Sequence, residues 1–209
     1  GVGPRVRYYQ TRIPSVWKSD DVEKILAVVD RANPCGKRDY AMILLAARLG
    51  VRIGDIREMR LEHLRWDTGH IEMSQSKTGQ PLVLPILDDV GWALIDYLKH
   101  GRPPAQCSEV FVRHNAPFGP LGSSNNIHNV ISKYFRLAGV PIPRGKRHGL
   151  HSLRHTLASR LLEQHVPLTT ISEIMGHLTS RSTRMYVKIN VEALRDCALD
   201  PEELIDAAA

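Results

Sequence analysis

Long hydrophobic runs and paired cysteines are both missing from this chain of 209 residues. No apolar run approaches the roughly 18 residues that a membrane-spanning helix needs, which excludes a transmembrane protein. The three cysteines, Cys35, Cys107 and Cys197, lie far apart and form no Cys-x-x-Cys motif. We therefore expect neither a disulfide framework nor a cysteine-based zinc site, and we expect the protein to act in a reducing cytoplasm.

Acidic residues are missing from two parts of the chain. None occurs in the first nineteen residues. None occurs between Val110 and Leu162 either, and this second stretch holds eight lysines and arginines and five histidines. The acids gather instead between Glu192 and Asp206. A basic stretch without carboxylates suits a polyanion-binding surface, because each phosphate must meet a cation and no repelling charge. On composition alone, a solvated surface with a chance imbalance explains the pattern equally well.

The remaining composition is that of a folded protein with one large domain: 43% of residues are hydrophobic, 24% are charged and the net charge is +6. The periodicity predicts a mainly α-helical fold with a small antiparallel β-sheet, in the α+β class. An Asp20–Glu23 capping box predicts the start of a first helix, and the turn at residues 33–36 its end. Alternating short runs predict a three-stranded meander over residues 63–86. The further helices predicted span residues 37–49, 88–99, 124–138, 151–164, 167–175, 180–188 and 191–205.

A cluster of basic side chains opens the predicted helix at residues 151–164. At helical spacing, His151, Arg154 and His155 share one side, next to a stripe of leucines. A guanidinium can hold a phosphate with two hydrogen bonds, and an imidazole can exchange a proton near neutral pH. A zinc site is disfavoured because no glutamate lies between the histidines and no acidic ligand lies nearby. Two surface histidines remain the ordinary alternative.

Polar side chains also occur singly at the ends of predicted elements. Arg52 follows a buried helix, with Asp55 three residues on, and Lys77 lies in the turn between two predicted strands. His177 follows a helix end, and Tyr186 comes nine residues later. Each has an ordinary explanation on its own, namely a surface ion pair, an exposed turn lysine, a helix cap or a packed tyrosine.

In this order and with these flanks, the residues resemble the catalytic domain of the tyrosine recombinase, or phage integrase, family over about residues 13–189. The matching motifs are Gly50–Asp55, Leu150–Thr156 and Ile174–His177, with 23 residues from Arg154 to His177. The chain departs from the family where Gly54 replaces a commoner Ser or Ala and Val51 replaces a commoner Leu.

The resemblance implies cleavage of a phosphodiester without a metal or another cofactor. Arg52 and Arg154 would hold the non-bridging oxygens and stabilise the transition state. Tyr186 would attack phosphorus and form a 3′-phosphotyrosyl link. His151 would accept the tyrosine proton, and Lys77 would protonate the leaving 5′ oxygen.

Other residues are given secondary roles by the same resemblance. His177 would donate a hydrogen bond to the phosphate, and Asp55 and His155 would orient the site. Three further cations of the acid-free stretch are expected to bind DNA: Arg144, Lys146 and Arg147.

The resemblance also implies an organisation and partners. We expect residues 1–17 to be a linker or arm that remains of an N-terminal DNA-binding domain, residues 18–190 to be the catalytic domain, and residues 191–209 to be a C-terminal helical tail. The expected partners are double-stranded DNA and further copies of the chain, as a homotetramer on paired DNA sites. Three alternatives remain: a type IB topoisomerase-like enzyme, a catalytically idle DNA-binding regulator and a metal-dependent nuclease.

Overall fold

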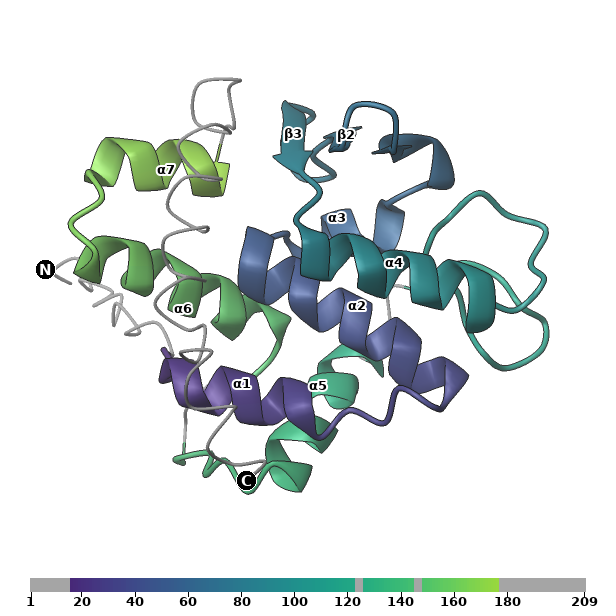
Figure 1. Cartoon of the computed structure of the whole chain (residues 1–209), viewed down its shortest axis with the longest axis horizontal. Helices are drawn as coiled ribbons and strands as arrows, with labels where there is room; N and C mark the ends of the chain where they lie inside the picture. Colours follow the sequence, from purple (N-terminus) through teal and green to yellow (C-terminus); the bar gives the residue numbers. More distant parts are fainter. Residues whose placement is uncertain (1–15, 123–125, 145–147, 177–209) are drawn as a thin grey trace, which may run out of the picture.

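The central element of the fold is helix α2 (Pro34–Leu49), which contacts most of the other helices. The computed structural model describes residues 16–122, 126–144 and 148–176. Figure 1 shows α2 in the middle, the small sheet at one end, and α1 and α5 at the opposite end. The other helices are α1 (Ser19–Ala27), α3 (Ile53–Glu58), α4 (Asp88–His100), α5 (Asn126–Leu137), α6 (Leu150–Glu163) and α7 (Leu168–Gly176).

The sheet is the predicted three-stranded antiparallel meander, in the order β1-β2-β3. Its strands are β1 (Leu64–Arg65), β2 (His70–Ser74) and β3 (Pro81–Pro85). Ile71 on β2 pairs with Leu64 on one side and Leu84 on the other, and all three side chains are buried. The first strand is shorter than expected because residues 61–63 form a 3-10 turn.

The prediction for the junction between α1 and α2 is wrong. Asn33 does not end the first helix, which stops at Ala27, but caps the second. Its side chain accepts a hydrogen bond from the Cys35 N–H at 2.8 Å, and Pro34 takes the first helical position, where a missing N–H costs nothing. The Asp20–Glu23 capping box is also not formed, since Lys18 occupies the cap position without a side-chain hydrogen bond.

Helix α3 is not predicted from the sequence. It has six residues, too few for an apolar stripe to show a helical period. It buries Asp55 and Ile56, so Asp55 belongs to a helix and not to a loop.

The fold class predicted from the sequence is confirmed: the described chain is mainly helical with one small antiparallel sheet. Within the described ranges, no helix is long and apolar enough to cross a membrane. The helices predicted at 180–188 and 191–205 lie outside the described residues.

The segment before α1 packs into the core through Trp17, the last residue of the stretch expected to be a linker. Its indole is 5% exposed and lies 4.4 Å from the Phe135 ring on α5. The indole N–H donates to Ser152 Oγ at 2.9 Å, and the Trp17 backbone N–H donates to Thr156 Oγ1 at 3.0 Å. Two bonds to α6 therefore fix this segment to the helix that carries His151.

Candidate active site

The end of α2 brings the first predicted arginine close to α6 and α7. Gly50 ends the helix in the left-handed conformation, with φ of 64°. A Cβ at this position would lie 3.2 Å from both Leu157 Cδ2 and Met175 Sδ, so a glycine serves both the backbone turn and the close approach. Arg52, two residues later, therefore lies at the N-cap of α3, near the middle of α6 and the end of α7.

The two predicted arginines meet at one backbone oxygen. Arg154, in the second turn of α6, donates to the carbonyls of Gly50 and Met175. Arg52 Nη2 donates to the same Met175 carbonyl at 3.4 Å. These four residues, together with Asp55 and Gln75, contribute to the lining of one small pocket. The two guanidinium groups thus converge on a site where one oxygen accepts hydrogen bonds from both.

The two histidines of α6, His151 and His155, lie next to each other on one side of the helix, as helical spacing predicts. His151 is exposed, whereas Leu150 and Leu153 are buried on the other side. The rings of His151 and His155 lie 4.5 Å apart, edge to face. Burial lowers the pKa of His155, and the neighbouring Arg154 charge lowers it further, which favours the neutral imidazole.

The turn between β2 and β3 carries Lys77, whose side chain is exposed. Asp55 holds this turn: its Oδ1 accepts from the Ser76 N–H at 2.7 Å and from Ser76 Oγ at 2.9 Å. Asp55 is only 1% exposed, and the described part of the structure shows no ion pair between it and Arg52. The Asp55 carboxylate therefore holds the hairpin that carries Lys77 through Ser76.

Gly54 allows the hairpin to approach α3 closely. A Cβ at residue 54 would lie 2.7 Å from Ser76 Oγ, which is shorter than real Cβ contacts. This contact explains the departure noted in the sequence, because a Ser or Ala at position 54 would displace the Ser76 hydroxyl. The glycine and the serine form a matched pair in this chain.

Several predicted site residues lie outside the described residues. These are His177, Tyr186, Lys146 and Arg147, of which His177 directly follows the end of α7. Arg144 is described and exposed. Among the described residues, no three His, Cys, Asp or Glu side chains are grouped as metal ligands.

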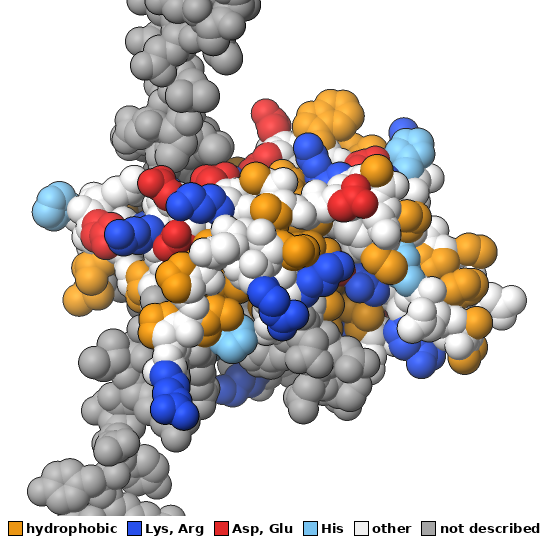
Figure 2. Space-filling view, turned by 90° about the horizontal axis from the view of Figure 1, so that it is seen from below, with side chains coloured by type: hydrophobic (Ala, Val, Ile, Leu, Met, Phe, Trp, Pro, Cys, Tyr) orange, Lys and Arg blue, Asp and Glu red, His pale blue; other side chains and the backbone are white. Residues whose placement is uncertain are grey.

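Figure 2 shows the molecule from the end where α1 and α5 lie, and positively charged side chains are exposed on this face. Lys and Arg are spread over this face, whereas Asp and Glu gather in the upper part of the view.

Comparison with known proteins decides the family. Residues 16–193 match the phage integrase family, which is most of the chain. The chain belongs to the phage integrase family. This confirms the resemblance drawn from the ordered motifs around Arg52, Lys77, Arg154, His177 and Tyr186.

Relatives by sequence include recombinases of bacteria. A Sinorhizobium fredii protein named as a putative integrase/recombinase, y4gC, is 40% identical over 189 residues, which cover 90% of this chain and 96% of that protein. The tyrosine recombinase XerD of Listeria innocua is 26% identical over 189 residues, which cover 88% of this chain and 61% of XerD. The matched segment therefore covers nearly all of the y4gC protein and less than two thirds of XerD.

A solved structure has the same fold. The site-specific recombinase XerH, in a pre-cleavage complex with its difH substrate, superposes with a TM-score of 0.65 and 19% identity. The likeness covers 83% of this chain and 50% of XerH.

Two polar positions of the site were not found from the sequence. Gln75 is 3% exposed and accepts a hydrogen bond from Arg52. The Trp17 indole donates a hydrogen bond to Ser152 on α6. Gln75 continues the inward alternation of Ile71 and Met73, so strand periodicity could have marked it as buried. No local signal marks Trp17, because its partners lie 135 and 139 residues away.

Proposed function

We propose that this chain is the catalytic domain of a site-specific DNA recombinase that cuts and rejoins strands through a 3′-phosphotyrosyl intermediate. The observation that carries the proposal is the convergence of Arg52 and Arg154 on one carbonyl oxygen, that of Met175. A non-bridging phosphate oxygen is also an acceptor, and it carries charge that a carbonyl lacks. Phosphate binding would therefore exchange a neutral acceptor for an anionic one, which strengthens each hydrogen bond.

The reaction assigns one step to each group. Tyr186 attacks phosphorus while the bond to the 5′ oxygen breaks, and the two arginines stabilise the charge that builds on the non-bridging oxygens. His151 accepts the phenol proton, and its exposure on α6 leaves it accessible to a partner group. Lys77 gives a proton to the leaving 5′ oxygen.

The cut strand stays attached to the protein, so rejoining needs no energy-supplying cofactor. The 5′ hydroxyl of a second DNA end attacks the phosphotyrosyl link and releases Tyr186. The solved XerH complex with its difH substrate supports double-stranded DNA as the partner. Arg144, Lys146 and Arg147 would add contacts to its backbone, His177 would bind the reacting phosphate, and a homotetramer would hold two DNA sites together.

Covalent capture tests this function and requires no defined target sequence. The full chain is incubated with a pool of duplexes that carry a nick at one fixed position and randomised sequence on both sides of it, so that duplexes cleaved close to the nick are selected. Strand cleavage releases a short piece past the nick, so the covalent adduct cannot reverse and is recovered under denaturing conditions. We expect nucleotide mass on the peptide that contains Tyr186, undiminished in EDTA.

Two variants make the result specific. Tyr186→Phe is expected to abolish the adduct, whereas Tyr40→Phe, which removes the same hydroxyl on the side of α2 that faces α4, is expected to retain it. An adduct on another residue, or no adduct with wild-type protein, would contradict the proposed function. Sequencing the captured DNA identifies the preferred target.

A further inference from the structure

Gln75 is the buried polar residue at the base of the hairpin that carries Lys77. Its backbone closes the turn in both directions. The Gln75 N–H donates to the Gln80 carbonyl at 2.8 Å, and the Gln75 carbonyl accepts from the Gly79 N–H at 2.8 Å. The backbone of Gln75 is therefore held in the turn by hydrogen bonds that do not involve its side chain.

The side-chain oxygen of Gln75 accepts two hydrogen bonds from different elements. Arg52 Nη1 donates to it at 2.8 Å, and Thr78 Oγ1 donates to it at 2.8 Å. An amide oxygen has two lone pairs and can hold both donors. Since Thr78 is next to Lys77, one atom joins the first arginine to the lysine turn.

We propose that Gln75 is a positioning residue that sets Lys77 relative to Arg52 during strand cleavage. This inference rests on the proposed function, in which both cations act on one phosphate. Arg52 would bind its non-bridging oxygens while Lys77 protonates its leaving oxygen, so the two must reach it together. A shared acceptor fixes their separation.

An amide is suited to this position because it holds a guanidinium without cancelling its charge. A carboxylate at position 75 could accept the same two hydrogen bonds, but it would neutralise Arg52 before a phosphate arrives. A Gln75→Glu variant therefore separates the two effects, since it keeps the hairpin in place and weakens the arginine.

A substrate with sulfur in place of the 5′ bridging oxygen isolates the contribution of Lys77. In the normal substrate, the bond from phosphorus to oxygen breaks and the oxygen takes a proton. In the sulfur substrate, the bond from phosphorus to sulfur breaks and a thiolate leaves without a proton, because a thiol has a pKa of about 8.5 and an alcohol a far higher one. A defect confined to proton donation is therefore removed by sulfur.

The variants are compared on both substrates, using a sequence recovered by covalent capture. Lys77→Ala is expected to slow adduct formation on the oxygen substrate by about 10²-fold or more, and sulfur is expected to restore the rate. Thr78→Val removes the hydroxyl but keeps the shape, and we expect a loss of about tenfold that sulfur also restores. Thr78→Ser keeps the hydroxyl and should react like wild type.

Gln75→Glu is expected to lose about tenfold or more on both substrates alike. Sulfur rescue of this variant, or loss in Thr78→Val that sulfur leaves unchanged, would overturn the inference. Wild-type rates in both variants would overturn it as well.

Hydrogen exchange provides a second test that does not need catalysis. In Gln75→Leu and Thr78→Val, the amide of Gly79 is expected to exchange faster than in wild type, while amides of the buried helix α2 keep their protection. Unchanged exchange at Gly79 would show that the side-chain contacts do not hold the turn. If wild-type protein forms no adduct, the proposed function fails, and the exchange result still decides whether Gln75 fixes the hairpin.

Discussion

The cations of the candidate site and those between α2 and α4 differ in what holds them. In the site, Arg52 donates to the neutral oxygens of the Gln75 amide and the Met175 carbonyl, and Arg154 also donates to that carbonyl. Between α2 and α4, Lys37 pairs with Asp96 at 2.7 Å, and Arg48 pairs with Asp89 at 3.0 Å. Neutral acceptors orient a guanidinium and leave its net charge available to a phosphate, whereas a carboxylate neutralises it.

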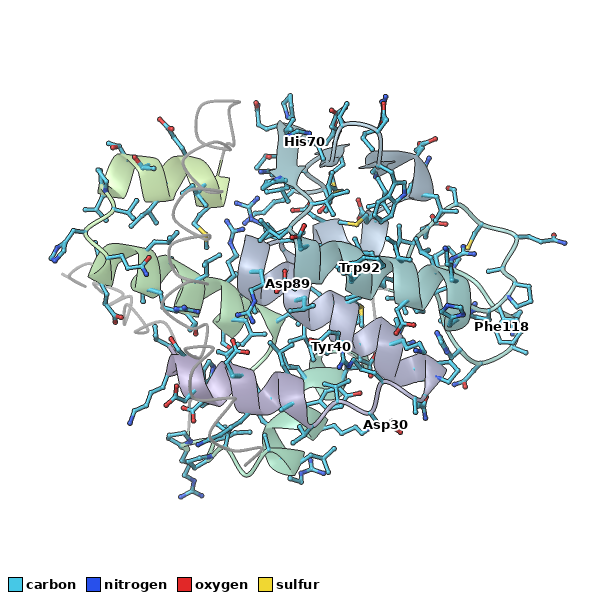
Figure 3. All side chains as sticks on the ribbon, in the orientation of Figure 1. Asp30, Tyr40, His70, Asp89, Trp92 and Phe118 are labelled. Atoms are coloured by element: carbon cyan, nitrogen blue, oxygen red, sulfur yellow. The ribbon has the colours of Figure 1, made fainter. Side chains whose placement is uncertain are left out.

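The guanidinium of Arg48 is held by ion pairs with two carboxylates, those of Glu23 and Asp89. Burial alone would lower its pKa, but hydrogen bonds and charges from Glu23 and Asp89 outweigh burial and raise it. It joins α1 to α4 through the last turn of α2. Figure 3 shows Asp89 and Trp92 on α4 near Tyr40 on α2. These three residues help to line a surface pocket of about 320 Å³. We therefore expect charge on this side to stabilise the fold and charge in the site to serve catalysis.

Arg154→Ala is the largest test of this difference. We expect adduct formation to slow by about 10²–10³-fold, because one donor to the transition-state charge is lost. Rates are measured under single-turnover conditions with the captured target. Arg48→Met is the matched control, and its adduct rate is expected to stay near wild type in the folded protein. An equal loss of rate in both variants would remove the distinction between the two regions.

Gly54→Ala tests the close approach of the lysine hairpin to α3. The added Cβ would meet Ser76 Oγ at 2.7 Å, so the hydroxyl must turn away from Asp55. The lost hydrogen bond outweighs the higher helix propensity of alanine, and we expect a net loss of about 1–2 kcal/mol in the free energy of unfolding. The measurement is urea denaturation. With Ser76→Ala in the same chain, the clash disappears, and the double variant should be more stable than the two single losses predict. Strict additivity would show that the two residues do not interact.

Arg48→Met is expected to lower the free energy of unfolding by about 1–2 kcal/mol, because Glu23 and Asp89 lose a partner that is largely buried. Lys37→Met is the comparison. Lys37 is about as buried as Arg48 but pairs with one carboxylate instead of two, so the loss should stay below about 1 kcal/mol. A larger effect from Lys37 would reverse the expected ranking.

Mild acid is expected to have the smallest effect and to act on both regions. Burial lowers the pKa of His63, His114 and His155, so each binds a proton more readily in the unfolded chain. Stability is therefore complete above about pH 6.5 and falls as the pH is lowered through the folded-state values. Urea denaturation at several pH values between about 7.5 and 5 measures this slope. His155→Gln should make it shallower, and an unchanged slope would assign the effect elsewhere.

The parts predictable from the sequence are those whose signal is local. The histidine and arginine side of α6 follows from helical spacing, and its buried leucines mark the opposite side. The role of Asn33 is ambiguous in the sequence because Asn-Pro follows one helix and also begins the next, and only the hydrogen bond from the Cys35 N–H separates the two interpretations. Short α3 has too few residues for periodicity to show.

The contacts that align the site could not be predicted in the same way. Arg154 reaches carbonyls 104 and 21 residues away, and Asp55 reaches a serine 21 residues away. Such pairings depend on how helices pack, and the sequence carries no periodic signal for them. The motifs therefore predict which residues act in the site, and the packing shows which oxygens accept hydrogen bonds from Arg52 and Arg154.

The bonds from Trp17 to Ser152 and Thr156 have a consequence for synthesis on the ribosome. The indole leaves the ribosome early, but its partners on α6 are translated 135 and 139 residues later. The α6 segment supplies both these partners and Arg154. A nascent chain therefore acquires Arg154 in the same segment that supplies the partners of Trp17, and a chain that ends before α6 lacks both Arg154 and those partners.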